Sequence, residues 1–420
     1  LPEEMEENGD LSNNKYEIPM SETSSIAEEE DLPSVRPSIA RRSLIGPFSL
    51  LLTFSGLDLQ RSLCGIKTQK CRSITSTVVF TIIALLFFGR FAFVMSNSSP
   101  SLSWGWGEAN IIGFTAAQSF VALILLARWT CLGMYSQIYT ELLRVKSFYS
   151  TTVVTSIHER SQFIGALVLG VFYILITLAS SIKTSIYGRF SVELNGTTVM
   201  LHPGYFVFSM DNLFGAELVL GVWMAMATVL ATASFVFIHA AVRMELTKYN
   251  EDLREAIDKK TLLDSLEKFN IRHIAILKLV SLLTDKLASF ASFSTFTILI
   301  ANVNALYLMS FMATTNAFST VMCVLWMLCT GSLIFIILNP PATIQQLLVE
   351  ATSLIVNHNE LIAHPDKIAL AQLMVTRNRV TPTRMAIMNA IVVNTHTPHL
   401  ITLIVPLIVA VLSYARKFQQ

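Results

Sequence analysis

Seven apolar segments constrain the fold of this chain more than any other feature of its sequence. The hydrocarbon core of a bilayer is about 30 Å thick, so a helix needs about 20 apolar residues to cross it. Seven segments meet this length, at residues 74–95, 111–136, 162–186, 213–242, 287–312, 317–338 and 386–414. Backbone donors and acceptors have no water partner in lipid, so each segment is expected to be a helix. The sequence therefore predicts an all-α polytopic membrane protein with seven transmembrane helices.

The composition agrees with a membrane environment and argues against several other classes of protein. Charged residues make up 14% of the chain, whereas an average soluble domain has roughly 25%. The net charge of +1 is far from the concentrated basic footprint that a nucleic-acid binder needs. The five cysteines include no CxxC pair, and the chain has no HExxH, GxSxG or glycine-rich phosphate motif. We therefore expect no metal, no cofactor and no enzymatic activity.

Lysine and arginine residues are concentrated in alternate connections between the apolar segments. They crowd the stretch before the first segment and the connections after the second, fourth and sixth, whereas the other connections carry only Arg189. Short cytoplasmic loops retain positive residues, so the amino terminus is expected inside the cell and the carboxyl terminus outside. Asn97 and Asn195 each begin an Asn-x-Ser/Thr sequon in a connection assigned to the outside, so both are predicted glycosylation sites. The expected location is the plasma membrane.

The regions that flank the transmembrane domain, residues 74–414, have distinct compositions. Residues 1–45 are rich in Glu, Ser, Asn and Pro, which predicts a disordered cytoplasmic tail. Residues 46–73 are moderately apolar but broken by glycine and proline, which fits a juxtamembrane lead-in at the membrane surface better than a span. Residues 415–420 are expected to form an extracellular tail.

The connection 243–286 has apolar residues at steps of mostly three to five, among them Leu246, Tyr249 and Leu253. This pattern predicts an amphipathic helix that runs well beyond the bilayer. Such a stripe needs a partner helix, which either the same subunit or a neighbouring subunit can supply. The pattern is equally consistent with both.

Several of these features together resemble the invertebrate gustatory-receptor superfamily, which includes insect taste and odorant receptors and a nematode branch. The shared features are the apolar patch FSLLLTFSGLDL, seven spans with the amino end inside, the charged helical connection after span four, and a polar-interrupted last span. The resemblance covers residues 48–415. The family signature in the last helix is Thr-Tyr, a short apolar run and Gln-Phe, whereas this chain has TPHLITLIVPLI, in which Thr397 alone matches. The departure favours a divergent, nematode-type member.

The resemblance implies a chemosensory receptor that acts as a ligand-gated, non-selective cation channel, assembled as a homo- or hetero-tetramer. It also implies that the last half-helix of each subunit lines the pore, and that residues 243–286 and 339–385 form a cytoplasmic anchor domain. A seven-helix receptor that signals through a G protein is the alternative. Rhodopsin-like receptors, however, have the amino terminus outside and carry Asp-Arg-Tyr and Asn-Pro-x-x-Tyr motifs, which this chain lacks. A secondary transporter is a third class, although no internal repeat supports it.

On this topology, the outer halves of six helices carry polar or aromatic side chains. Polar groups in a span are expected to face the bundle interior or a wet cavity, so a pocket for a small molecule from the extracellular side would collect them. The predicted ligand-binding residues are Gln118, Glu217, Trp223, Asn302, Asn304, Tyr307 and Trp326. Each has a structural alternative, because aromatic side chains anchor helices at the interface and Glu217 can pair with Arg90 or Lys183.

The last apolar segment carries the predicted pore lining. A helix that runs outward from Thr397 places Thr402, Val405, Val409 and Leu412 on one stripe. A ring of Val or Leu can close a channel by dewetting, whereas a ring of threonine keeps a hydrated path for cations. The predicted gate is Val405 or Val409. The same stripe is also consistent with packing against lipid or against span five.

Overall fold

The computed structural model of the chain describes a set of ranges that all lie within one compact unit, Val35–Gln420. The described residues are 37–55, 70–97, 103–148, 160–187, 190–194, 197–201, 214–311, 317–358, 361, 364–388 and 390–417. The predicted glycosylation site Asn195 lies outside them. Asn97 is the last residue of helix α4 (Lys70–Asn97), and its side chain is outside the description.

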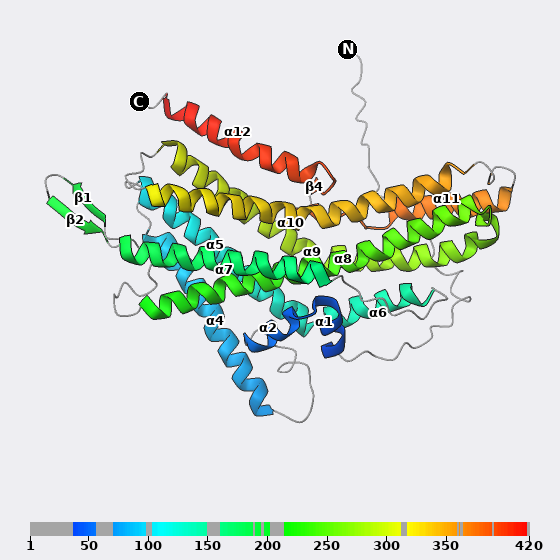
Figure 1. Ribbon diagram of the computed structural model, residues 1–420, viewed down its shortest axis with the longest axis horizontal. Helices are drawn as coiled ribbons and strands as arrows, with labels where there is room; N and C mark the ends of the chain where they lie inside the picture. The colour runs from blue at the N-terminus through cyan, green and yellow to red at the C-terminus, as the bar shows by residue number, and fades with distance from the viewer. Residues whose placement is uncertain are drawn as a thin grey trace, which may run out of the picture. The chain divides into compact units, whose positions relative to one another are not determined.

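Three long helices form the centre of the unit: α8 (Phe214–Asp258), α9 (Leu262–Phe311) and α10 (Ala317–Val356). At 1.5 Å per residue they are about 60–75 Å long, roughly twice the hydrocarbon thickness of a bilayer. They contact one another and run side by side (Figure 1). A tight turn joins α8 to α9, and Lys260 in this turn has a left-handed φ of 56°. A helix of this length in a membrane must extend well beyond the hydrocarbon.

Further helices pack around this centre. Those of intermediate length are α4, α5 (Ser103–Cys131), α7 (Arg160–Tyr187) and α12 (Thr397–Lys417). The short ones are α1 (Pro37–Ile45), α2 (Phe48–Phe54), α6 (Met134–Ser147) and α11 (Pro365–Val380). Two antiparallel hairpins pair β1 (Phe190–Leu194) with β2 (Thr197–Leu201), and β3 (Ala386–Ile387) with β4 (Ile391–Val392). α5 contacts α4, α8 and α9, and α7 lies against α8.

Three helices in the described part of the chain contain stretches long and apolar enough to cross a membrane: Gly113–Cys131, Leu218–Asp258 and Val324–Val356. Shorter apolar stretches are found at Val78–Ala92, Ile164–Ala179 and Thr397–Leu412. The fifth predicted segment, 287–312, falls in the second half of α9. The chain is therefore a helical membrane protein. The count of seven spans and the orientation of the termini stay predictions.

The amino-proximal region is more ordered than the composition indicates. Residues 37–45, which the composition assigns to a disordered tail, form α1. The reason is that Leu44 and Ile45, together with Phe48 and Leu52 of α2, are buried in the hydrophobic core. α1 contacts α6 and α8, and α2 contacts α8. The lead-in therefore packs against these helices.

Two further boundaries differ from the expected ones. The second span is expected to run from 111 to 136, but α5 ends at Cys131, because Gly133 has a φ of 63° and turns the chain before α6 begins. The seventh span is expected to be helical from 386. Instead, Ala386–Ile387 pairs with Ile391–Val392 in the β3–β4 hairpin, and α12 begins only at Thr397. The Thr397 hydroxyl lies 2.9 Å from the backbone nitrogen of Asn394 and accepts a hydrogen bond from it.

Buried aromatic rings pack together where α5, α8 and α9 meet. The ring of Phe290 lies 5.7 Å from that of Trp129 and 5.5 Å from that of Phe235, centroid to centroid. Trp129 and these two phenylalanines are at most 2% exposed. The indole nitrogen of Trp129 donates to the Lys286 carbonyl at 3.2 Å, so the buried polar atom of this ring is satisfied.

In the segment after residue 242, the predicted apolar stripe is buried within the single chain. Leu246, Tyr249 and Leu253 of α8 are 0–1% exposed, as are Leu262 and Leu266 of α9. The stripe therefore packs within the subunit, which accounts for its periodicity without a neighbouring subunit. We call the α8–α9 hairpin beyond residue 242, with the last turns of α10 and with α11, the extension.

Ion pairs join the helices of the extension to one another and to α6, and two of them, at Arg272 and Glu245, have a buried member. They are Lys146–Glu245 at 3.4 Å, Lys278–Glu141 at 2.9 Å, Arg272–Asp252 at 2.6 Å, Lys367–Glu267 at 3.1 Å, and Arg254–Glu350. They join α6 to both α8 and α9, α8 to α9 and α10, and α9 to α11. The guanidinium carbon of Arg272 also lies 5.2 Å from the centre of the Tyr249 ring.

His273 is a buried histidine of the extension, next to Arg272 in the sequence. It is 1% exposed, and its ring lies 5.9 Å from that of Tyr249. Burial, and to a lesser extent the positive charge of Arg377, lowers the pKa of His273 to about 4, while the Met374 backbone acts weakly in the opposite direction. The imidazole is therefore neutral at physiological pH.

Candidate functional site

A buried polar cluster joins α5 to α9 inside otherwise apolar helices. Gln118 is 5% exposed. Its Nε2 donates to the Ser294 hydroxyl at 2.7 Å, and its Oε1 accepts from the Thr297 hydroxyl at 2.6 Å. The amide is thus paired at both ends, which avoids the cost of an unsatisfied polar group in an apolar setting.

A second polar cluster joins α9 to α10. The Thr330 hydroxyl lies 2.9 Å from Asn302 Oδ1 and 2.8 Å from the Trp326 carbonyl, so its one hydrogen is shared between two acceptors. Asn302 Nδ2 donates to the Ile298 carbonyl at 2.9 Å. Hydrogen bonds between membrane helices such as Thr330–Asn302 fix which faces of the two helices meet.

A small cavity lies between these clusters, with walls from α5, α7, α8, α9 and α10. Its polar and aromatic lining consists of Thr115, Gln118, Tyr173, Thr228, Thr232, Thr297, Trp326 and Thr330, together with Phe114. The volume is about 20 Å³, which holds one or two water molecules. A larger ligand would have to displace the ends of side chains such as Tyr173 and Trp326.

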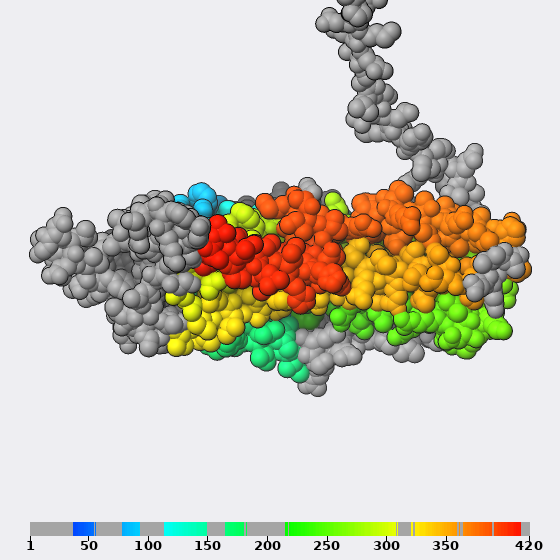
Figure 2. Space-filling model, turned by 90° about the horizontal axis from the view of Figure 1, so that it is seen from above, coloured from blue at the N-terminus to red at the C-terminus, as the bar shows by residue number. Residues whose placement is uncertain are grey.

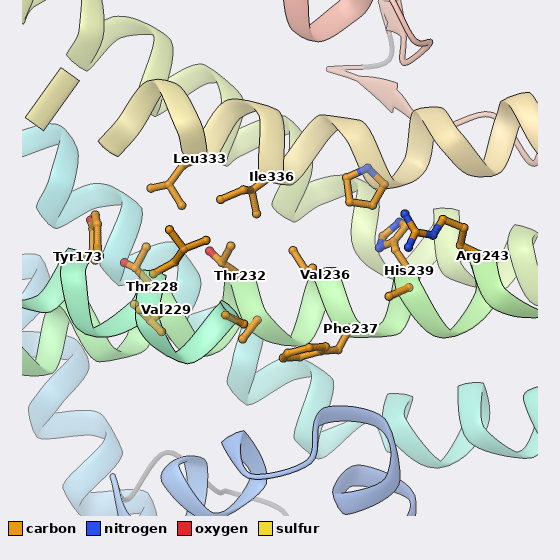
Figure 3. A pocket seen from close by; sticks show the side chains of 16 residues that line it. Tyr173, Thr228, Val229, Thr232, Val236, Phe237, His239, Arg243, Leu333 and Ile336 are labelled. Atoms are coloured by element: carbon orange, nitrogen blue, oxygen red, sulfur yellow. The ribbon is translucent and has the colours of Figure 1, made fainter. Parts of the chain in front are cut away.

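A larger cavity of about 290 Å³ continues from the small one between α7, α8 and α10 (Figure 3). The two cavities share Tyr173, Thr228, Thr232 and Leu333. The wall is mainly apolar, and this volume is close to the lower end of the range for ligand pockets. In Figure 3, Tyr173 lies at one end of the lining and Arg243 and His239 at the other.

The family model that matches this chain is described as "Caenorhabditis protein of unknown function, DUF267", and it matches residues 44–409. The chain belongs to this family. The matched residues include both cavities and the first part of α12, up to Val409. None of the curated proteins matches the chain by sequence.

Solved structures show the fold. The insect olfactory receptor OR5 from Machilis hrabei is similar with a TM-score of 0.56 at 14% identity, over 90% of this chain and 99% of that chain. The structure of the same receptor in complex with eugenol gives a TM-score of 0.61 at 15% identity, over 90% of this chain and 100% of that chain. This member of the DUF267 family therefore has the fold of an insect olfactory receptor.

The structure brings together some of the predicted ligand residues and separates others. Gln118 and Trp326 line the small cavity, and Asn302 lies next to it through its contact with Thr330. Trp223 lies outside the described linings of both cavities. Its indole nitrogen instead donates to the Ser55 carbonyl at 3.1 Å, beside α2. The other predicted residues are Asn304 and Tyr307, which are partly buried outside the described linings of both cavities, and Glu217, whose side chain is outside the description.

The sequence-based prediction missed several hydroxyl residues of the small cavity, chiefly Tyr173, Thr228, Thr297 and Thr330. A signal was present, since Thr228 and Thr232 are one helical turn apart inside an apolar run. A threonine in a membrane helix can satisfy its hydroxyl on its own backbone, as Thr228 does with the Met224 carbonyl at 3.3 Å. The residue type alone therefore does not mark a cavity. In the described part of the chain, His, Cys, Asp and Glu side chains form no group of three that could hold a metal ion.

The predicted pore residues divide between two environments on α12. This helix lies on the outer face of the unit beside α10 (Figure 2), and it contacts α9 and α10. Val405 and Val409 are 9% and 5% exposed on the packed side, whereas Thr402 and Leu412 are exposed. An uncovered row on the opposite side, 54% to 69% exposed, consists of Leu400, Leu403, Leu407 and Val411.

Proposed function

We propose that this chain is the subunit of a chemosensory receptor that acts as a ligand-gated cation channel. The observation that carries the proposal is the likeness to an insect olfactory receptor along the whole of that receptor's chain. That receptor was solved in complex with eugenol, a small molecule. The interior cavity, enclosed by five helices of this chain, supports a binding role for the same part of the fold.

The proposed ligand is a small, largely apolar molecule that enters from the extracellular side and binds in the small cavity. Trp326 and Phe114 offer apolar contact area, and Gln118 and Thr297 offer a donor and an acceptor. Because these polar groups already bond to each other, a ligand has to exchange one of their bonds for its own. This favours a molecule with one hydrogen-bonding group over a purely apolar one.

The proposed topology has seven spans, with the amino terminus in the cytoplasm and the carboxyl terminus outside, in the plasma membrane. On this topology α4, α5, α7, α8, α9, α10 and α12 are the spans, and the extension lies in the cytoplasm. The exposed ion pairs Arg254–Glu350 and Lys367–Glu267 on the extension support an aqueous setting for it.

The proposed assembly is a tetramer of this chain or of related subunits. The extension carries exposed apolar side chains, among them Val349, Val356 and Val380 at 61%, 61% and 67% exposure. Val349 and Val356 are about two helical turns apart on α10, so they share one face, and clustered apolar surface in water marks an interface. We assign these side chains to contacts between subunits in the anchor domain.

The proposed pore is lined by four copies of α12. Thr402 and Leu412 are exposed and belong to the proposed lining, together with the uncovered row at Leu403, Leu407 and Val411. Val405 and Val409 pack on the same subunit, so a gate at either position requires α12 to rotate. Serine at Leu407 should raise the resting conductance if the uncovered row closes the pore, and serine at Val409 should do so if the predicted stripe closes it. If neither variant changes the resting current, the placement of the gate in this helix is wrong.

The test of the function is expression of the full chain alone in a cell without endogenous receptors, with current recorded during application of a panel of small volatile and soluble ligands. A channel keeps its response when a non-hydrolysable GDP analogue fills the pipette, whereas a receptor coupled to a G protein loses it. In a responsive cell, Gln118→Ala should shift the concentration dependence, and Gln137→Ala, on the exposed face of α6, should not. An absence of current with every ligand despite surface expression would reject a self-sufficient channel.

A further inference from the structure

We propose that the larger cavity binds a lysophospholipid: a lipid with a single acyl chain, an anionic phosphate headgroup and a free glycerol hydroxyl. The acyl chain would occupy the apolar part of the cavity between α7, α8 and α10, the phosphate would bind Arg243, and the hydroxyl would bind His239. This site adjoins the proposed ligand site in the small cavity, with which it shares part of its lining, and its occupancy is measured without channel activity.

The first argument is the length and character of the cavity. Its lining follows α8 from Thr228 to Arg243, which is about 22 Å at 1.5 Å per residue. One leaflet of hydrocarbon is roughly 15 Å deep, so the cavity is long enough for an extended acyl chain. Leu169, Val236 and Ile336 are among the apolar side chains that would contact it.

The second argument is access from the bilayer. α7 is an outer helix of the unit, and its neighbouring side chains Leu167, Val168 and Leu169 are 45%, 61% and 52% exposed. Leu169 also lines the cavity. The cavity therefore reaches the lipid-facing surface, where a chain can enter sideways without passing through water.

The third argument is the charge at one end. Arg243 lines the cavity and is partly exposed, and no hydrogen bond or ion pair joins it to another residue in the described ranges. Basic side chains nearby are paired, as Lys146 is with Glu245 and Arg254 with Glu350. A guanidinium offers a planar set of donors that matches two phosphate oxygens. Arg243 lies at the end of the apolar run of α8, where a headgroup would emerge from the hydrocarbon.

The fourth argument is the hydrogen-bonding state of His239, one turn deeper than Arg243. Its Nδ1 lies 2.8 Å from the Phe235 carbonyl, which can only accept. In the neutral imidazole Nδ1 therefore carries the hydrogen, and Nε2 keeps an acceptor lone pair. A diacyl phospholipid has esters at both remaining glycerol oxygens, which cannot donate. A lysophospholipid has a glycerol hydroxyl that can donate to Nε2, about one turn deeper than its phosphate.

The test uses the full chain in nanodiscs of phosphatidylcholine, with binding of radiolabelled oleoyl lysophosphatidic acid measured by scintillation proximity. Arg243→Gln should weaken this binding by about tenfold or more, since hydrogen bonds to charged groups are strong. Arg379→Gln removes the same charge from an exposed position on α11 and should leave binding unchanged. Ile336→Trp, which fills the apolar part of the cavity, should abolish binding.

Competition with unlabelled lipids that each lack one chemical group tests which groups of the ligand the cavity recognises. Oleic acid lacks the phosphate and diacyl phosphatidic acid lacks the free hydroxyl, so both should displace the probe poorly. Equal displacement by oleic acid would overturn the phosphate assignment, and equal displacement by phosphatidic acid would overturn the role of His239. His239→Phe should remove the preference for lysophosphatidic acid over phosphatidic acid. If Arg243→Gln and Ile336→Trp both bind the probe like the unmodified chain, the cavity is not the site.

Discussion

The two halves of α9 differ in the polar side chains that they bury beside their apolar ones. In the first half, within the extension, Leu262, Leu266 and Ile276 are buried, while Lys268 and Lys278 are exposed. In the second half, Ser294, Thr297 and Asn302 are among the buried residues, and Phe296 is 41% exposed. Both halves of this continuous helix bury apolar residues, but the second half adds uncharged hydroxyl and amide groups to the buried side, beside Phe290 and Ile298.

This difference shows how the surrounding solvent selects the buried face. In water, burial of apolar area stabilises the packing, so the stripe of the extension faces its partner helices. In lipid, an apolar surface gains little from leaving the solvent, and the polar groups gain most from meeting each other. The mutations below test whether the extension depends on its apolar core and the membrane half on its polar contacts.

The largest effect is expected for Tyr249→Ala in the extension. The ring is fully buried and packs edge-on against Phe269, with centroids 5.8 Å apart, and under Arg272. Loss of a buried aromatic ring should lower the free energy of unfolding by about 3–5 kcal/mol. Thermal denaturation of the protein in detergent measures it. The control is Ile271→Ala, at a position 48% exposed, and an equal loss in both variants would contradict the buried stripe.

A pH dependence is expected next, from His273. Its pKa is about 4 in the folded chain and about 6.5 when unfolded, so between these values the unfolded state binds more protons. Stability should therefore be complete above pH 6.5 and fall as the pH is lowered, by roughly 2 kcal/mol at pH 5. Melting temperatures at pH 7.5 and pH 5 measure this fall. His273→Leu should remove most of the difference, and a His273→Leu variant with the same pH dependence would assign it to another group.

A smaller effect is expected for Gln118→Leu in the membrane half. This change leaves the hydroxyls of Ser294 and Thr297 without their amide partner, which should cost about 1 kcal/mol, as is typical of polar contacts between membrane helices. Gln137→Leu, on the exposed face of α6, is the matched control. If Gln118→Leu raises the melting temperature instead, the polar cluster serves the cavity and not the packing.

The smallest effect is expected for Lys367→Ala, which removes the pair with Glu267 on the surface of the extension. Exposed ion pairs contribute less than about 1 kcal/mol and weaken with salt. The melting temperature should change slightly at low salt and not at all at high salt. A large loss at both salt concentrations would mean that polar contacts, and not the apolar stripe, hold the extension together.

Many features of the fold can be predicted from the sequence, because apolar runs and apolar periodicity depend on residues close together in the chain. The apolar runs predict a helical membrane protein, and the stripe at Leu246, Tyr249 and Leu253 predicts a buried helix face. The short helix α6 was missed, although Tyr135, Ile138 and Leu142 recur at three- and four-residue steps and are buried. The turn at Gly133, which separates α6 from α5, has no local pattern that distinguishes it from a glycine inside a helix.

The sequence by itself determined that the long apolar runs are helical, because hydrogen bonding within a helix and transfer into lipid depend on neighbouring residues of the chain. Only the tertiary structure decided which polar groups meet. Gln118 and Thr297 are far apart in sequence and lie in apolar runs, where no amphipathic period marks their faces. Their contact, the position of Trp223 beside Ser55, and the face of α12 that stays uncovered follow from how the helices rotate against one another. That rotation is set by the combined packing of several helices and not by any one of them.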